Sequence, residues 1–376
     1  MFEVELISAD HKDVIHDVAF DYYGRRMATC SSDQTVKVWD EDEKGNWIES
    51  SNWKAHSGSI WRISWAHPEF GQVLVTCSFD RTASVWEEIV GEKVASLSTP
   101  SRRWVRRMTL DDSRTSVSDV KFAPKYLGLM LATTSADGII RIYEAPDIMN
   151  LTQWPVLHEI ANKLPLSCIS WNTSTYMLSS QLLAAGSDET ATHTGKVFIF
   201  AYSETRKWVK IDAINEITQP VTDLAFAPNP GRTFHMLAVA SKDLYIVNIR
   251  GVTDASANTK LDIQATKFSD HNCPVWRVCW NMLATMLIST GDDGCVRIWR
   301  SIFIHIWSDT INIKFFYICV ENYTKDWKCA AVIKAEGSYP SYEPSLNSPV
   351  MTVSATATAK YYKKGSISNP NQVPWH

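Results

Sequence analysis

Three sets of histidine, hydroxyl and aspartate side chains recur along the chain with similar spacing, and each is followed by a tryptophan. The sets are His11, Thr29, Asp33 and Trp39; His56, Thr76, Asp80 and Trp86; and His271, Ser289, Asp293 and Trp299. A hydroxyl, an imidazole and a carboxylate are the groups of a hydrolase triad, so hydrolysis is the first chemistry to consider. The same groups can instead form a buried chain of hydrogen bonds from aspartate to histidine to hydroxyl to indole.

The repetition of the set favours the structural interpretation. An enzyme needs one exposed triad beside an oxyanion hole, whereas this chain has three similar sets and no Gly-x-Ser-x-Gly elbow. His56 and His67 do not form a zinc site, because no second pair of ligands stands at a zinc spacing. The sequence also lacks a P-loop, a dinucleotide fingerprint and a His-Glu-x-x-His motif. We therefore predict no catalytic residue, no metal site and no cofactor.

The three sets lie within a longer repeat with a period of about 50 residues. Each of six copies opens with an alternating apolar run that ends in an aromatic residue, such as VIHDVAF from Val14. A strand of small residues follows, then a third strand, and then a more polar strand such as WVRRMTL from Trp104. The third strands end at Trp39, Trp86, Tyr143, Phe200, Val247 and Trp299. Alternation with a period of two predicts an all-β chain of four-stranded units.

Six such units predict a six-bladed β-propeller. One sheet cannot bury both of its faces, and stacking the sheets around an axis buries them while leaving only short edges. We place the propeller at residues 1–337. Residues 338–376 are rich in Ser, Pro, Tyr, Thr, Ala and Lys without apolar periodicity, which predicts a disordered tail.

The repeat resembles the WD-repeat family. Asp10-His11 and Ala55-His56 occupy the Gly-His position of that family, and Trp39-Asp40 is a literal Trp-Asp pair. Blades four and five depart from the pattern, because Ala185 and Val239 stand near the hydroxyl position and no histidine precedes them. These two blades are expected to depend on apolar packing alone.

Longer stretches resemble the Seh (Sec thirteen homologue) family of WD-repeat nucleoporins. Among them are YGRRMATCSSDQTVKVWD from Tyr23 and DSRTSVSDVKFAPKYLGLMLATTSADGIIRIYEAPDIMNL from Asp112. The resemblance implies a non-enzymatic scaffold of the Y-shaped coat complex of the nuclear pore, active in nucleocytoplasmic transport and pore assembly. It also implies a role in the GATOR (SEA) complex, which relays amino-acid sufficiency to the growth kinase at lysosomal or vacuolar membranes. Membrane association would then occur only through complexes.

The resemblance further implies an open ring that a partner completes with inserted strands. The expected partner is an α-solenoid nucleoporin, alongside other Y-complex subunits and GATOR/SEA subunits. Counting strands modestly favours the open form, because WKCAAVIKAEG from Trp327 already supplies a fourth strand to blade six and leaves the early strand FEVELIS surplus. The alternative is ordinary closure, in which the early strand pairs within blade six and displaces the later one. We predict that Phe2, Val4, Leu6 and Ser8 line the partner's binding edge.

One segment departs from the Seh pattern. Residues 301–321, SIFIHIWSDTINIKFFYICVE, replace a short turn and are biased toward Ile, Phe, Asn and Lys. A retained intron and a genuine lineage insertion both explain that bias. A membrane span is disfavoured because His305, Asp309 and Lys314 interrupt the apolar run.

Composition and charge exclude several other classes. The net charge of -4 gives no reason to expect direct binding to nucleic acid. The arginine-rich stretch from Ser101 to Leu110 is expected to be the exposed outer strand of blade two rather than a phosphate site. Eight cysteines without a Cys-x-x-Cys pair favour a reducing compartment, and the acidic amino terminus predicts no export. A generic WD-repeat adaptor, such as a vesicle-coat subunit or a ubiquitin-ligase substrate receptor, is the alternative function.

Overall fold

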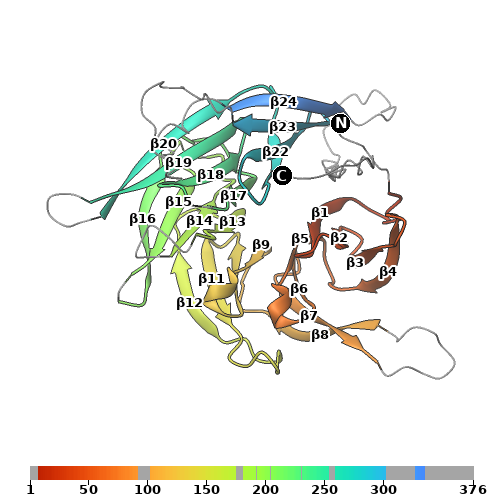
Figure 1. The fold of residues 1–376 in the computed structure, drawn as a ribbon. Coiled ribbons are helices and arrows are strands. Elements are labelled where there is room, and N and C mark those ends of the chain that lie inside the picture. The colour runs from red at the N-terminus through yellow and green to blue at the C-terminus, as the bar shows by residue number, and fades with distance from the viewer. Residues whose placement is uncertain are drawn as a thin grey trace, which may run out of the picture.

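The chain forms six four-stranded antiparallel sheets arranged around a common axis (Figure 1). The structure is a computed structural model, and it describes residues 7–91, 102–174, 181–191, 193–203, 205–229, 231–253, 259–301 and 327–334. The prediction of an all-β, six-bladed propeller is confirmed. The helices of this described part are two 3-10 turns, η1 (Pro68–Phe70) and η2 (Lys125–Leu127). None of its helices is long and apolar enough to cross a membrane.

Each blade is a meander in which the strands follow one another in chain order from the axis outward. Blade one contains β1 (Ile15–Phe20), β2 (Arg26–Ser31), β3 (Thr35–Glu41) and β4 (Trp47–Lys54). Blade two contains β5 (Ile60–Trp65), β6 (Val73–Ser78), β7 (Ala83–Val90) and β8 (Arg102–Leu110). Blade three contains β9 (Val117–Phe122), β10 (Met130–Ser135), β11 (Ile139–Glu144) and β12 (Val156–Ala161).

The second half of the ring repeats this plan. Blade four contains β13 (Cys168–Trp171), β14 (Leu182–Gly186), β15 (Val197–Tyr202) and β16 (Trp208–Ile214). Blade five contains β17 (Asp223–Phe226), β18 (His235–Ala240), β19 (Leu244–Thr253) and β20 (Thr259–Phe268). Blade six contains β21 (Val275–Trp280), β22 (Met286–Gly291), β23 (Cys295–Ser301) and β24 (Trp327–Lys334).

The hydrophobic core lies between neighbouring blades. Five clusters of buried residues join blades one and two, two and three, three and four, four and five, and five and six. The small residues of the second strands allow the sheets to approach closely, and Ala28 and Cys30 of β2 are fully buried against blade two. Apolar burial between sheets therefore sets the geometry of the ring.

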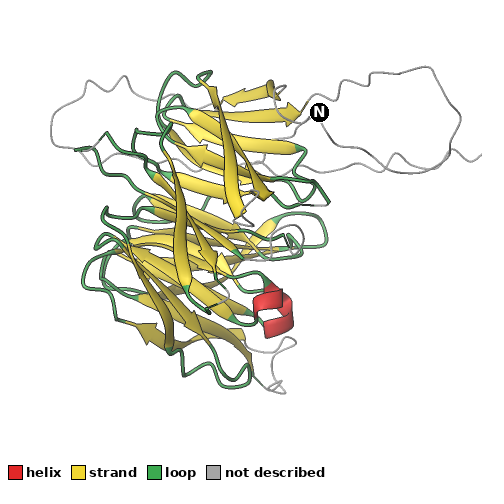
Figure 2. Ribbon diagram, turned by 90° about the vertical axis from the view of Figure 1, so that its left-hand side faces the viewer, coloured by secondary structure: helices red, strands yellow, loops and turns green. Residues whose placement is uncertain are grey.

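The antiparallel order gives the ring two different faces. The loops between first and second strands share one face, the hairpin face, which carries residues 21–25, 66–72 and 123–129 with both 3-10 helices (Figure 2). The turns between second and third strands, including Asp33 and Asp80, share the opposite face, the tetrad face.

Several predicted features fall on residues outside the described part of the chain. They include Phe2, Val4 and Leu6, the range 302–326 and the range 335–376, so the predicted binding edge, insertion and tail remain predictions. Ser301 is the last residue of β23 and pairs with Trp327 of β24, which means that an insertion can begin only after it. β24 is the fourth strand of blade six, as the strand count requires.

Candidate functional site: tetrads, axis and the junction of blades six and one

The structure brings each predicted tetrad together on the tetrad face. In blade two, Nδ1 of His56 lies 3.0 Å from Oδ2 of Asp80, and Nε2 lies 2.7 Å from Oγ1 of Thr76. The indole of Trp86 donates to the same Thr76 oxygen at 3.1 Å. In blade one, His11 lies 2.9 Å from both Asp33 and Thr29, and the Trp39 indole donates to Thr29 at 3.2 Å. In blade six, His271 lies 3.2 Å from Asp293 and 2.7 Å from Ser289, and the Trp299 indole donates to Ser289 at 2.8 Å.

The burial of the tetrads supports a structural role. The side chains of Thr76 and Ser289 are fully buried, and both ring nitrogens of His56 already have partners. A nucleophile must reach its substrate, whereas the Thr76 hydroxyl is buried and its oxygen already accepts from the Trp86 indole. The tetrads therefore satisfy one another's buried polar groups, which would otherwise each cost about 1 to 3 kcal/mol.

The turn aspartate of blade one also organises its own loop. Oδ1 of Asp33 accepts from the amide and the hydroxyl of Thr35 at 2.9 and 2.6 Å, and Oδ2 accepts from the Lys12 amide at 2.9 Å. Burial raises the pKa of Asp33, but these hydrogen bonds and that of His11 outweigh it, and the pKa falls to about 2. The carboxylate is thus ionised at neutral pH.

Blade six holds its tetrad with an additional cation. Arg297 contacts Asp293 and lies 2.5 Å from Nδ1 of His271. His271, Cys273 and Asp293 place potential ligand atoms within 4.8 Å of one another, but the guanidinium occupies the space beside two of them. The guanidinium of Arg297 therefore already supplies a positive charge where a metal ion would lie. A Cβ on Gly291 would lie 2.6 Å from Nδ1 of His271, so this strand end needs glycine.

Blade three uses a different set of residues in the same place. Oη of Tyr143 donates to Oδ2 of Asp112 at 3.1 Å, and Arg141 lies 3.3 Å from Oδ2 of the turn residue Asp137. Burial and Asp112 raise the pKa of Tyr143, which keeps the phenol protonated as a donor. Asp112 and Arg141 were missed in the sequence because the search required a histidine. The signal in the sequence that could have revealed this set is Asp112, an aspartate that stands shortly before β9.

The expectation that blades four and five depend on apolar packing alone is wrong. Oγ of Ser167 donates to the carbonyl of Val221 at 2.6 Å, and the amide of Phe226 donates to Oγ of Ser170 at 2.9 Å. The first bond joins the residues just before β13 and β17, and the second joins the two strands themselves. Polar bonds also lie within the blades, where Ser167 donates to the Gly186 carbonyl at 3.3 Å and Ser241 donates to the Pro220 carbonyl at 2.8 Å.

Six residues in the same register of the first strands form a ring around the axis. In blade order they are Asp17, Arg62, Asp119, Cys168, Asp223 and Arg277. Arg62 lies 3.1 Å from Asp223 of the opposite blade and 3.8 Å from Asp119 of the next blade. Five of the six residues are buried and Arg277 is partly buried, and the ring was not identified from the sequence.

The two distances agree with the pKa shifts of the aspartates. Burial raises the pKa of Asp223, but Arg62 and Arg277 outweigh it and the pKa is lowered. For Asp119 burial exceeds the attraction of Arg62 and Lys121, so its pKa is raised. Arg62 itself stays charged, because Asp223 and Asp119 raise its pKa despite its burial.

The axial aspartates also join blades in pairs. Oδ2 of Asp17 accepts from the Ile63 amide at 3.1 Å, and Trp65 donates to the Ala19 carbonyl at 3.0 Å. Between blades three and four, Asp119 accepts from the Ile169 amide at 2.9 Å, and Trp171 donates to the Lys121 carbonyl at 3.2 Å. Between blades five and six, Asp223 accepts from the Val278 amide at 3.1 Å, and Trp280 donates to the Ala225 carbonyl at 2.9 Å. The first strands therefore alternate between two types around the ring.

The junction between blades six and one differs from the other five. Within the described ranges no hydrophobic cluster joins these blades, and their link is polar: Arg277 donates to the His16 carbonyl at 2.8 Å and lies 3.8 Å from Asp17. Figure 1 shows β21–β24 and β1–β4 at the two ends of the blade order. Ser8, the described member of the predicted binding edge, donates to Asp10 at 2.8 Å before β1 begins.

Residues at the same register of different blades show that apolar side chains are less buried at this junction than at the others. Ile15 and Val18 of β1 pair with Ser31 and Thr29, as Ile60 and Ile63 of β5 pair with Ser78 and Thr76. Ile60 and Ile63 are 0% and 1% exposed against blade one, whereas Ile15 and Val18 are only partly buried. On the other side, Ile288 of β22 is partly buried, although Ala28 at the same register of β2 is fully buried.

The arginine-rich segment forms the outer strand of blade two, as expected. Arg107 pairs with Glu87 at 2.5 Å, Arg102 lies 3.4 Å from Asp40, and Trp104 is buried. Arg26, which the sequence did not single out, contacts Asp40 at 2.7 Å and Glu88 at 2.7 Å and so links blades one and two.

Comparison with known proteins agrees with this architecture. The family model for the WD domain, G-beta repeat, matches residues 5–40, 48–87 and 263–300. The chain is 74% identical over 377 residues to the Drosophila melanogaster protein named Nucleoporin seh1, covering 100% of both chains. It is 54% identical over 345 residues to Nucleoporin SEH1 of Homo sapiens, covering 90% of each, and 52% identical over 345 residues to that of Danio rerio, covering 90% of this chain and 89% of the relative.

Proposed function

We propose, because the chain belongs to the Seh1 nucleoporin family, that it is a non-enzymatic structural subunit of the nuclear pore and resides at the nuclear envelope. More specifically, it serves in the Y-shaped coat complex, where an α-solenoid nucleoporin inserts strands between blades six and one. The same junction serves a solenoid subunit of the GATOR (SEA) complex at lysosomal or vacuolar membranes. Each tetrad stabilises the strands of its own blade, and the tetrads have no catalytic role.

The observation that carries this proposal is the incomplete burial at the junction of blades six and one. Ile15, Val18 and Ile288 stay partly exposed where matched residues at other junctions are buried. An inserted blade would cover both faces, each buried Å² of apolar surface contributing about 25 cal/mol. Strand addition would supply backbone hydrogen bonds, and alternate side chains would supply specificity.

Co-purification tests the proposal. The full chain is co-expressed with the α-solenoid nucleoporin of the Y-shaped coat from the same species, and the complex is isolated through a tag on the solenoid. Deleting residues 1–8, placing proline at Val4 and Leu6, or changing Val18 to Lys should abolish co-purification. Ile48→Lys, a change at an exposed position of β4, should leave it intact.

Thermal unfolding distinguishes lost binding from lost folding. The variants should still unfold cooperatively, because five apolar junctions are unchanged. Co-purification of the Val18→Lys and truncated variants at wild-type levels would overturn the proposed mode of assembly. A parallel isolation with tagged GATOR subunits tests the second setting separately.

A further inference from the structure

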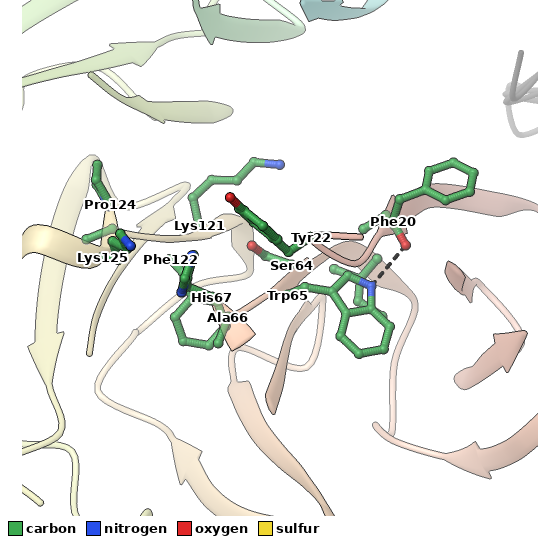
Figure 3. A pocket seen from close by; sticks show the side chains of 13 residues that line it. Phe20, Tyr22, Ser64, Trp65, Ala66, His67, Lys121, Phe122, Pro124 and Lys125 are labelled. Carbon is green, nitrogen blue, oxygen red and sulfur yellow. Dashed lines mark hydrogen bonds between the residues drawn. The ribbon is translucent and has the colours of Figure 1, made fainter. Parts of the chain in front are cut away.

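A pocket opens on the hairpin face, away from both the tetrads and the junction of blades six and one. It has a volume of about 330 Å³ and is formed by the ends of β1, β5 and β9 and the loops that follow them (Figure 3). Its walls include Phe20, Tyr22, Trp65 and Phe122, and Lys121 lines it from blade three. The size is at the lower end of that of ligand pockets, enough for a few side chains rather than a large cofactor.

Lys121 is the unusual residue of this pocket. In Figure 3 its side chain and that of Tyr22 extend into the same open space. The first strands place small residues at the same register, namely Ala19, Ser64, Ser170, Ala225 and Cys279. Among the described residues the ammonium of Lys121 has no hydrogen bond or ion pair. Burial lowers the pKa of Lys121, but Asp119 and Asp17 outweigh it and the net shift is upward, so the group is cationic.

The nearby aspartates do not neutralise Lys121 by direct contact. Asp119 accepts from the Ile169 amide and lies beside Arg62, and it remains deeper along the axis. At the rim, Lys125 lies 3.9 Å from Glu69, so these two exposed charges compensate each other. The pocket therefore presents a cation that has no direct hydrogen-bond or ion-pair partner among the described residues, set among aromatic walls.

The rim is wider than a small ligand requires. Tyr22 and Tyr23 are 58% and 67% exposed on the loop of blade one, and Tyr126 is 43% exposed on blade three. Tyrosine is enriched in protein interfaces because a rigid apolar ring carries a polar end. Tyrosines on both sides of a pocket indicate a ligand that extends across blades one to three.

We propose that this pocket binds an acidic peptide segment of a partner protein, with a carboxylate on Lys121 and an apolar side chain against Trp65 and Tyr22. A carboxylate supplies the missing partner of the lysine, and a charge-assisted hydrogen bond in a partly dry site is stronger than one in water. The flanking peptide lies over the exposed tyrosines. This second contact surface does not depend on the proposed junction between blades six and one.

Peptide selection on the intact protein tests this inference. A random dodecapeptide phage library is panned against the purified full chain, and enriched sequences are synthesised with each Glu or Asp also replaced by its amide. Binding is measured by calorimetry on wild-type protein and on Lys121→Gln and Tyr22→Ala. Lys207→Gln is the matched control, because it removes an exposed lysine from the outer strand region of blade four.

We expect enriched peptides to combine acidic and apolar residues. The amide peptides and the Lys121→Gln protein should each lose about tenfold in affinity, and Lys207→Gln should lose none. Tyr22→Ala keeps the test valid if Lys121→Gln folds poorly, because Tyr22 is on an exposed loop. The proposal is overturned if no acidic peptide is enriched, or if binding survives both pocket variants. Lys121-dependent binding of single-stranded oligodeoxythymidine without acidic peptides would overturn it in favour of nucleic acid.

Discussion

Arg62 of blade two donates from Nη2 to Oδ1 of Asp223 in blade five, directly across the ring, at 3.1 Å. The two residues are 161 positions apart in the sequence, and both side chains are almost entirely buried. A buried ion pair contributes little net stability, because desolvation offsets the attraction. Its loss is costly, however, because the remaining charge has no partner.

Arg62→Met should therefore destabilise the ring by about 3 to 5 kcal/mol, since the buried Asp223 and Asp119 lose the guanidinium that contacts them. Urea denaturation of Arg62→Met, Asp223→Asn and the double variant measures the coupling. The double variant should lose clearly less than the sum of the two single changes. Arg107→Met, at a partly exposed ion pair with Glu87 on the outer strand, should cost at most about 1 kcal/mol. Additive losses in the cycle would contradict the pairing.

The blade-two tetrad should be required for stability. His56→Ala removes one hydrogen-bond partner from each of Asp80 and Thr76 and should cost about 1 to 3 kcal/mol. Trp86→Ala also creates a cavity and should cost about 3 to 5 kcal/mol. Thermal unfolding measures both, with the exposed His193→Ala as the control. A melting temperature for His56→Ala equal to that of the wild type would rule out the proposed role.

Asp33 should make stability depend on pH in the acid range. Its pKa is about 2 in the folded chain against an ordinary value of 3.8, so the unfolded chain binds the proton more readily. The contribution is complete above about pH 4 and is lost as the pH falls toward 2. Asp33→Asn should be less stable at pH 6 and should show a shallower decrease below pH 4. Denaturant titrations across this range, with the exposed Asp188→Asn as the control, test the sign. An unchanged acid slope in Asp33→Asn would contradict the assignment.

The segment after β23 should be dispensable for folding. Deleting residues 302–321 retains Ser301, which is buried and pairs with Trp327, and leaves residues 322–326 to connect β23 and β24. A loop of this length can join two antiparallel strands. The melting temperature should stay the same or rise, and aggregation measured by light scattering should fall because a segment rich in Ile and Phe is removed. Loss of cooperative unfolding would show that the segment is packed against the blade.

The sequence predicted the parts of the fold that repeat within one blade. Alternating apolar runs, small-residue strands and the His, Thr, Asp and Trp spacing follow from contacts inside a sheet, such as those of His56 with Thr76. Such contacts recur at fixed separations in the chain and leave a period that a reader can count.

Contacts between blades left no comparable signal. Arg62 and Asp223 form their bond through the closure of the whole ring, and Tyr143 replaced the tetrad tryptophan by taking Asp112 as its acceptor. In blades four and five, Ser167 and Ser170 bond across the interface between the two blades. These residues could be recognised only after the blades had been placed around an axis.

The polar link at Arg277 also has a mechanical consequence. Close-packed apolar interfaces resist deformation, whereas a guanidinium on a flexible side chain can follow a carbonyl over a range of positions. Among the described residues, five joints of the ring are of the first kind and the joint between Arg277 and His16 is of the second. A force across the ring should therefore separate blades six and one first, while the five apolar interfaces keep their packing.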